Sequence, residues 1–268
     1  MQVFGDDGAR IDVRIDGADG ADRRAAIVLI HGFPLLREIW DEQSAALART
    51  HRVVLPDLRG MGASSVPDGP YLMETLASDV AAALDALGIE RAAIAGHSLG
   101  GYVALAFARM FAERVTHLAL VCSRLAADSP EQAAARCELA DRIERDGDPG
   151  ALTDQYLPRL FAPQAYAERA DLVERVRAMA RRCSVEGLAS MLRGMAMRVA
   201  ADDIAPDLDV PVRIVAGGHD AVVPQAESAA MARAFPRGRL TVCAQSGHLP
   251  MLEEPEDVTA ALAALLSE

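Results

Sequence analysis

The sequence contains no lysine, and all 27 of its basic residues are arginine. Without a lysine amine the chain cannot form a Schiff base, hold pyridoxal phosphate covalently or supply the lysine of a P-loop. Acidic residues number 39, which gives a formal net charge of -12. Because such a chain repels phosphate groups, neither a nucleic acid nor an anionic membrane surface is expected as a partner.

Long apolar runs and paired cysteines are also missing. No stretch reaches 18 apolar residues, which predicts no membrane span, and the acidic first residues do not predict a signal peptide. The cysteines stand far apart with no C-x-x-C pair, at Cys122, Cys137, Cys183 and Cys243. This usage predicts reduced thiols and a cytoplasmic protein. Since no H-E-x-x-H occurs and no G-x-G-x-x-G follows a strand pattern, neither a metal nor a dinucleotide cofactor is expected.

What is present is a repeated alternation of short apolar runs with helical patterns. Strands are predicted at 26–30, 52–56, 92–95, 115–121, 210–216 and 239–243. Continuous apolar runs of this length are typical of strands buried on both faces of a parallel sheet. Residues 2–16 alternate loosely instead, which predicts a hairpin at a sheet edge. The fold class is therefore α/β, with a mostly parallel, doubly wound sheet.

The alternation stops between residues 124 and 200. Only helical patterns appear there, near 130–146, 164–182 and 184–198, and the twelve arginines of the segment equal its twelve acidic residues. The rest of the chain thus carries the whole net charge. This shift predicts a helical lid inserted over 123–202, between the two parts of a core formed by 1–122 and 203–268.

The motif Gly96-His97-Ser98-Leu99-Gly100 stands where a strand pattern gives way to a helix pattern. A turn this sharp strains the serine backbone and leaves no room for side chains two positions away, which explains the two glycines. It would expose the Ser98 hydroxyl at a helix N-terminus, where backbone N–H groups can bind a developing negative charge. Ser98 is therefore the candidate nucleophile.

A serine hydroxyl needs an adjacent base, and the base needs an orienting acid. His248 follows the last predicted strand in a Ser-Gly-His turn, and Asp220 follows the 210–216 strand. The carboxyl ends of parallel strands meet at one edge of a sheet, so both side chains are expected near Ser98. The backbone N–H groups of Phe33 and Leu99 are the candidate oxyanion hole.

Three motifs, in the expected order, resemble the α/β-hydrolase superfamily. His31-Gly32-Phe33 resembles the end of its oxyanion strand, residues 96–101 resemble its nucleophile elbow, and residues 247–250 with Glu253-Glu254-Pro255 resemble its catalytic-histidine loop. The resemblance covers nearly the whole chain and puts the inserted helices where that fold carries its lid. The single-lid carboxylesterase and enol-lactonase-like group is the most similar, which implies a small ester or lactone as substrate.

Five residues are candidates for the substrate pocket, and each has a plainer structural role. Trp40, the only tryptophan, either lines an acyl pocket or packs in the core. Arg124 either binds a substrate carboxylate or is a solvated charge. Met191 and Met195 lie on a helical stripe that either roofs the pocket or is only the packed face of its helix. Leu249, in the histidine loop, is the fifth.

These residues together predict a serine hydrolase that needs no cofactor and cleaves its substrate through an acyl-enzyme. Two alternatives stay open. A cofactor-free perhydrolase or a C–C or C–N lyase would use the same triad, although Leu99 stands where the perhydrolase pattern usually has methionine. A non-catalytic receptor of the same fold would bind a ligand under the lid. The sequence allows a homodimer but does not decide it.

Overall fold

A computed structural model describes residues 1–17 and 26–268. These residues contain an eight-stranded sheet in the order β1-β2-β4-β3-β5-β6-β7-β8. Its strands are β1 (Gln2–Phe4), β2 (Arg10–Asp16), β3 (Ala26–Ile30), β4 (Arg52–Pro56), β5 (Ala92–His97), β6 (Val115–Val121), β7 (Val212–Gly217) and β8 (Gly238–Cys243). β2 pairs antiparallel with β1 and β4, and every other pair is parallel. The mostly parallel sheet and the edge hairpin are confirmed.

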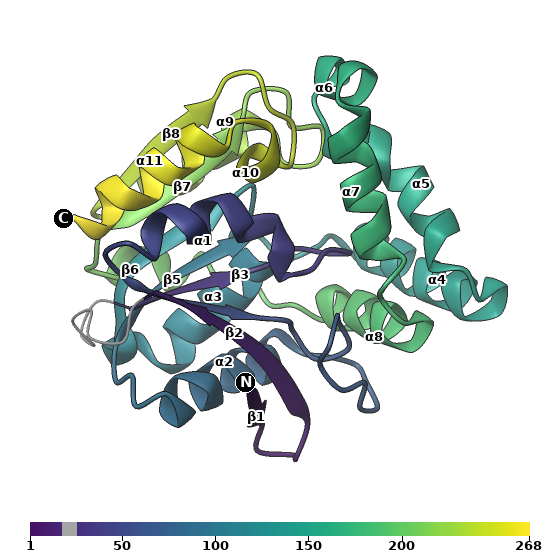
Figure 1. Ribbon diagram of the computed structural model, residues 1–268, viewed down its shortest axis with the longest axis horizontal. Helices are drawn as coiled ribbons and strands as arrows, with labels where there is room; N and C mark the ends of the chain where they lie inside the picture. The colour runs from purple at the N-terminus through teal and green to yellow at the C-terminus, as the bar shows by residue number, and fades with distance from the viewer. Residues whose placement is uncertain (18–25) are drawn as a thin grey trace.

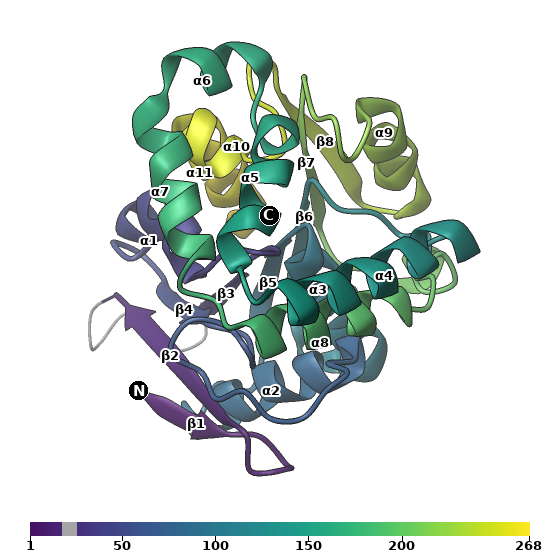
Figure 2. The ribbon, with the colours of Figure 1, turned by 90° about the vertical axis from the view of Figure 1, so that its right-hand side faces the viewer.

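Helices cover both faces of the sheet, because central strands such as β3 and β5 are buried along their whole length and must be shielded on each side. On one face α1 (Asp41–Leu47) packs against α11 (Pro255–Leu266). The other face carries α2 (Met73–Ala86), α3 (Leu99–Met110) and α9 (Gln225–Ala234) (Figures 1 and 2). Shorter turns of helix are η1 (Arg37–Trp40), η2 (Ala112–Arg114), η3 (Ala205–Asp207) and α10 (Pro250–Glu253). Within the described ranges, none of the helices has the length and apolarity needed to cross a membrane.

Between β6 and β7 the chain is helical and lies to one side of the sheet (Figure 1). We call α4 (Pro130–Asp146), α5 (Pro149–Leu160), α6 (Pro163–Glu168), α7 (Ala170–Ala180) and α8 (Val185–Ala196) the helical segment. Within it α4 packs against α8 and α5 against α7, and Figure 2 shows α4 and α8 side by side. The division of the chain into a core and a lid domain stays a prediction.

The helical segment begins where its sequence predicts. Ser129 caps α4 by accepting a hydrogen bond from the Gln132 N–H, the Gln132 side chain caps the Ser129 N–H in return, and Gly147 ends the helix at φ 67°. Two predictions were wrong. The run expected at 164–182 is broken at Arg169, and α5 was not predicted at all. α5 contains Pro158, a residue that normally argues against a helix interior.

Candidate functional site

Ser98 occupies a strained turn between β5 and α3. Its backbone lies at φ 50° and ψ -111°, a positive φ that residues other than glycine rarely adopt. A Cβ atom at Gly96 would come within 2.0 Å of the Gly100 carbonyl oxygen, and one at Gly100 within 2.3 Å of the Ile30 carbonyl oxygen. The expectation that both glycines are sterically required is confirmed, and Ser98 stands at the N-terminus of α3.

Asp220 and His248 are joined by a short hydrogen bond. His248 Nδ1 lies 2.8 Å from Asp220 Oδ2, while Asp220 Oδ1 accepts the N–H groups of Val222 at 2.7 Å and Val223 at 2.9 Å. Burial opposes ionisation of Asp220, but His248 and these two amides outweigh it, so the pKa of the carboxyl is lowered. An ionised Asp220 holds the proton of His248 on Nδ1 and leaves Nε2 as the basic nitrogen.

Ser98 and His248 line one cavity of about 90 Å³. The full lining is Phe33, Pro34, Ser98, Tyr102, Arg136, Tyr156, Arg159, Leu160, Met195, Val222 and His248. No hydrogen bond joins the Ser98 hydroxyl to His248 among the described residues. Such catalytic bonds are often long in ligand-free proteins and tighten when substrate binds.

Of the two residues predicted to form an oxyanion hole, Phe33 lines this cavity and Leu99 directly follows the lining residue Ser98. Leu99 is the first residue of α3, and Phe33 follows the end of β3 and lines the cavity. Neither N–H group donates to an acceptor in residues 1–17 or 26–268. The first N–H groups of a helix have no partner within it, so the Leu99 amide, like that of Phe33, can donate to an anion.

Only one of the five predicted pocket residues lines the cavity, and it is Met195. Trp40, Met191 and Leu249 are fully buried in the hydrophobic core and do not reach it. Arg124 lies outside it, because its guanidinium donates to the Val222 carbonyl at 2.7 Å and pairs with Glu227 at 3.3 Å. At Trp40 and Met191 the structure has the plainer alternative of a packed core side chain. Arg124 fits neither of its two expected roles, because it is a largely buried charge paired with Glu227 rather than a solvated one.

Sequence reasoning missed four polar lining residues, Tyr102, Arg136, Tyr156 and Arg159. A signal for Tyr102 was available: it follows Ser98 by four residues, which is one turn along the same face of α3. The other three come from α4 and α5, and nothing in the sequence marks which of many arginines in that segment face the cavity.

The histidine loop is held by the end of α5. The His248 N–H donates to the Leu160 carbonyl at 2.8 Å. The carboxylate of Glu253 bridges the same two elements, because Oε2 accepts the Ala162 N–H at 2.8 Å and Oε1 accepts the Gly247 N–H at 2.9 Å. The position of His248 therefore depends on the helical segment as well as on the sheet.

We expect Glu253→Gln to weaken this support. Both carboxylate oxygens face N–H donors, so the amide NH₂ of glutamine must meet one of those donors without an acceptor. The free energy of unfolding should fall by about 1–3 kcal/mol, and kcat on any substrate should fall with it. Urea unfolding measures the first effect. Glu256→Gln, at an exposed position of α11, is the matched control, and equal stability of the two variants would contradict the bridge.

Three further histidines lie near the motifs of the site, at His97, His31 and His219. The ring of His97 donates from Nε2 to the His248 carbonyl at 2.8 Å, and its centroid lies 4.9 Å from that of His248. His31 Nε2 accepts the Leu58 N–H at 3.0 Å. His219 is exposed and does not line the cavity. The rings of His97 and His31 thus brace backbone around the site.

Because the rings of His97 and His31 are buried, we expect the protein to lose stability in mild acid. Burial lowers the pKa of His97 to about 3 and also lowers the pKa of His31. Since the unfolded chain binds these protons near its ordinary histidine pKa of about 6.5, unfolding takes up protons below that pH. The free energy of unfolding should fall by about 1.4 kcal/mol per pH unit for each ring. Urea unfolding at pH 7.5, 6.0 and 5.0 measures this, and an unchanged midpoint would contradict it.

Cys122 is a further residue beside Asp220 and His248 that the sequence did not single out. It is fully buried at φ 47°, and its sulfur lies within 4.8 Å of ligand atoms of Asp220 and His248. Burial raises the pKa of the thiol well above its usual range, the opposite of what a metal-binding thiolate needs. Asp220 and His248 already bond each other, so this cluster does not fit a metal site. All four cysteines are free, as predicted.

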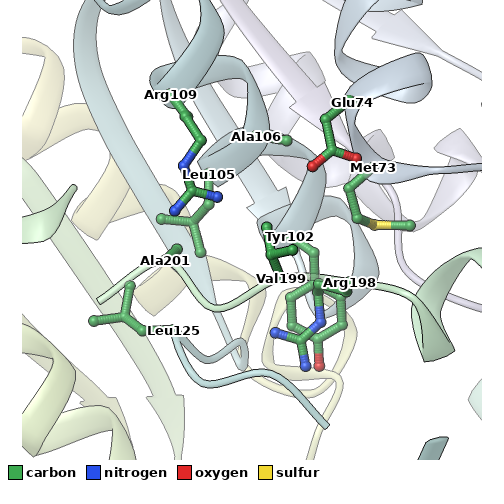
Figure 3. A pocket seen from close by; sticks show the side chains of 10 residues that line it. All are labelled: Met73, Glu74, Tyr102, Leu105, Ala106, Arg109, Leu125, Arg198, Val199 and Ala201. Carbon is green, nitrogen blue, oxygen red and sulfur yellow. The ribbon is translucent and has the colours of Figure 1, made fainter. Parts of the chain in front are cut away.

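Two other cavities lie away from Ser98. One, shown in Figure 3, is only about 10 Å³, enough for a single water at most. In it the Arg198 guanidinium lies over the Tyr102 ring, 3.8 Å from its centroid. The other, about 520 Å³, lies between residues 66–70 and α8, and its lining does not include Ser98, Asp220 or His248. The cavity at Ser98 is therefore the candidate active site.

Known proteins share this architecture. A family model described as the alpha/beta hydrolase family matches residues 27–262. A Cronobacter sakazakii protein, named as a candidate carbamate hydrolase (RutD), is 31% identical over 235 residues, 86% of each chain. The malate-bound thermophilic esterase from Thermogutta terrifontis is 35% identical with a TM-score of 0.94, covering 100% of this chain and 97% of that one. The enol-lactonase from Burkholderia xenovorans LB400 is 29% identical with a TM-score of 0.92, covering 100% of both chains.

The match to the family model spans all the parallel strands except the first residue of β3, together with Ser98, Asp220 and His248. The chain belongs to the alpha/beta hydrolase family.

Proposed function

We propose that this protein is a serine hydrolase that cleaves a small carboxylic ester or lactone through an acyl-enzyme. One observation carries the proposal: Ser98 on its strained turn and His248, hydrogen-bonded to Asp220, open into the same cavity. A nucleophile and a base that line one cavity, with an orienting acid hydrogen-bonded to the base, are the parts that acyl transfer requires.

In the proposed reaction His248 Nε2 takes the proton of Ser98 as Oγ attacks the substrate carbonyl. The N–H groups of Phe33 and Leu99 bind the oxygen on which negative charge develops. The imidazolium, stabilised by Asp220, then returns its proton to the leaving alcohol. A water molecule repeats the sequence on the acyl-enzyme, with His248 again as base, and frees the acid.

The size of the cavity favours small substrates. At about 90 Å³ it is well below the several hundred Å³ typical of pockets for drug-sized ligands. The printed names of the similar proteins, an esterase and an enol-lactonase, agree with an ester or lactone. A perhydrolase, a lyase or a receptor would have the same triad geometry, so the chemistry must be tested directly.

Covalent labelling tests the acyl-enzyme step. A fluorophosphonate should modify the wild type at one residue, found at Ser98 by mass spectrometry. Turnover is measured on p-nitrophenyl esters from acetate to decanoate and on a small lactone series, with the highest kcat/KM expected for short acyl chains. Labelling at Ser98 with no hydrolysis of any ester or lactone would favour the lyase or receptor alternatives. No labelling would contradict a reactive serine.

A further inference from the structure

The cavity at Ser98 is positively charged in a strongly negative protein. The formal net charge of the chain is -12, yet the cavity lining contains two arginines, Arg136 and Arg159, and no aspartate or glutamate. Charges that line a cleft with low-dielectric walls focus their field into it. The lining therefore attracts an anion, although the protein as a whole repels one.

The first of these arginines is fixed in place. Arg136 Nε lies 2.5 Å from Asp128 Oδ2, and Asp128 Oδ1 also pairs with Arg198 at 3.1 Å. The side chains of Asp128 and Arg198 are nearly inaccessible, with exposed fractions of 3% and 4%. Two guanidinium groups share one carboxylate, so this cluster keeps a surplus positive charge beside the cavity.

The second arginine, Arg159, has a guanidinium group that is free to bind an anion. Arg159, near the C-terminus of α5, makes one long hydrogen bond of 3.4 Å to the Ala221 carbonyl, next to Asp220. No carboxylate lies within 4.0 Å of its guanidinium in residues 1–17 and 26–268. Arg159 is an exposed residue of the cavity lining, so most of its N–H donors face solvent and can exchange water for a carboxylate, which the planar fork of arginine matches.

We infer that the substrate carries a carboxylate in addition to the bond that is cleaved, and that Arg159 binds this group while Arg136 adds a fixed positive charge. The inference rests on the proposed function and narrows its substrate class to monoanionic esters or lactones. The sequence suggested such a role for Arg124, but that arginine is paired with Glu227 outside the cavity.

The test compares esters that differ only in charge. Monomethyl succinate, glutarate and adipate are each paired with the methyl ester in which the free carboxylate is replaced by a carboxamide, and methanol release gives kcat/KM. We expect the carboxylate to be preferred at least tenfold for one chain length, and the preference to shrink as salt is added. Arg159→Gln should lower the ratio of the two kcat/KM values at least fivefold, mainly through KM.

Arg145→Gln is the matched control, since it removes the same charge from an exposed position of α4 outside the cavity, and it should leave the ratio as in the wild type. A ratio near one for all three chain lengths, or a preference that survives in Arg159→Gln, would overturn the inference. If neither ester is hydrolysed and Ser98 is not labelled, the proposed function fails. Calorimetry with the same ester pairs, on the wild type and on Arg159→Gln, still decides the inference. Tighter binding of the carboxylate by the wild type that is lost in Arg159→Gln supports it, and equal or absent binding overturns it.

Discussion

Replacing Ser98 by alanine is expected to lower kcat/KM for the best p-nitrophenyl ester by about 10⁴-fold or more. The substitution removes the attacking oxygen and leaves the two unpaired amides and the cavity in place, so only binding and oxyanion stabilisation remain. Alanine keeps the Cβ atom, and with it the strain of the φ 50° turn, so the melting temperature should change little. Steady-state kinetics with the melting temperature measured on the same preparation gives both results.

Ser228→Ala is the matched control for this change. Ser228 is a buried serine of α9 whose hydroxyl has no hydrogen-bond partner among the described residues, and it is not part of the cavity lining. Its loss should leave kcat/KM as in the wild type. If Ser98→Ala kept more than about a hundredth of the wild-type rate, catalysis through a serine acyl-enzyme would be untenable.

Asp220→Asn should be nearly as damaging, with kcat lowered by about 10⁴-fold. The hydrogen bonds around residue 220 determine the orientation of the asparagine side-chain amide. Oδ1 accepts the N–H groups of Val222 and Val223, so the amide oxygen must keep that position and the NH₂ must face His248 Nδ1. Nδ1 would then have to accept a hydrogen bond, and the ring proton would move to Nε2, the nitrogen that has to receive the proton of Ser98.

This tautomer argument makes a second prediction for the same variant. Since the asparagine keeps both backbone hydrogen bonds, Asp220→Asn should fold and bind substrate normally, with the loss confined to kcat. Asp209→Asn, an exposed aspartate before the opposite end of β7, should behave as the wild type. A fall in kcat of only a few fold for Asp220→Asn would mean that another group orients His248.

The sheet and the meeting of Asp220 with His248 could be predicted from the sequence, because both follow from local patterns and from the topology of a parallel sheet. Continuous apolar runs identify β3, β5 and β6, and in a parallel sheet the residues that follow the strands must gather at one edge. That topology explains why Asp220 and His248, 28 positions apart, form a hydrogen bond in the structure. Gly96 and Gly100 likewise predict the strained turn at Ser98, because neither position has room for a side chain.

The walls of the cavity could not be predicted in this way. They depend on how α4 and α5 pack over the site. α5 was not predicted, because Pro158 inside it argues against a helix. Burial could not be judged either: Trp40 and Met191 are suitable pocket residues by chemistry, but their side chains pack in the core. Among the arginines of the helical segment, only the folded arrangement separates the free Arg159 from Arg124, which is held by Glu227.

The contact between α5 and the histidine loop limits how the specificity of the proposed hydrolase can change. Leu160 contributes to both the cavity and the histidine loop. It lines the cavity, and its carbonyl accepts the His248 N–H. A substitution there that admits a bulkier acyl group also shifts the proposed base, so gains in substrate range would come with slower chemistry. Tyr156 and Met195 line the same cavity without bonding the histidine loop. Adaptation to new substrates, natural or directed, should therefore accumulate at those two positions and spare residue 160.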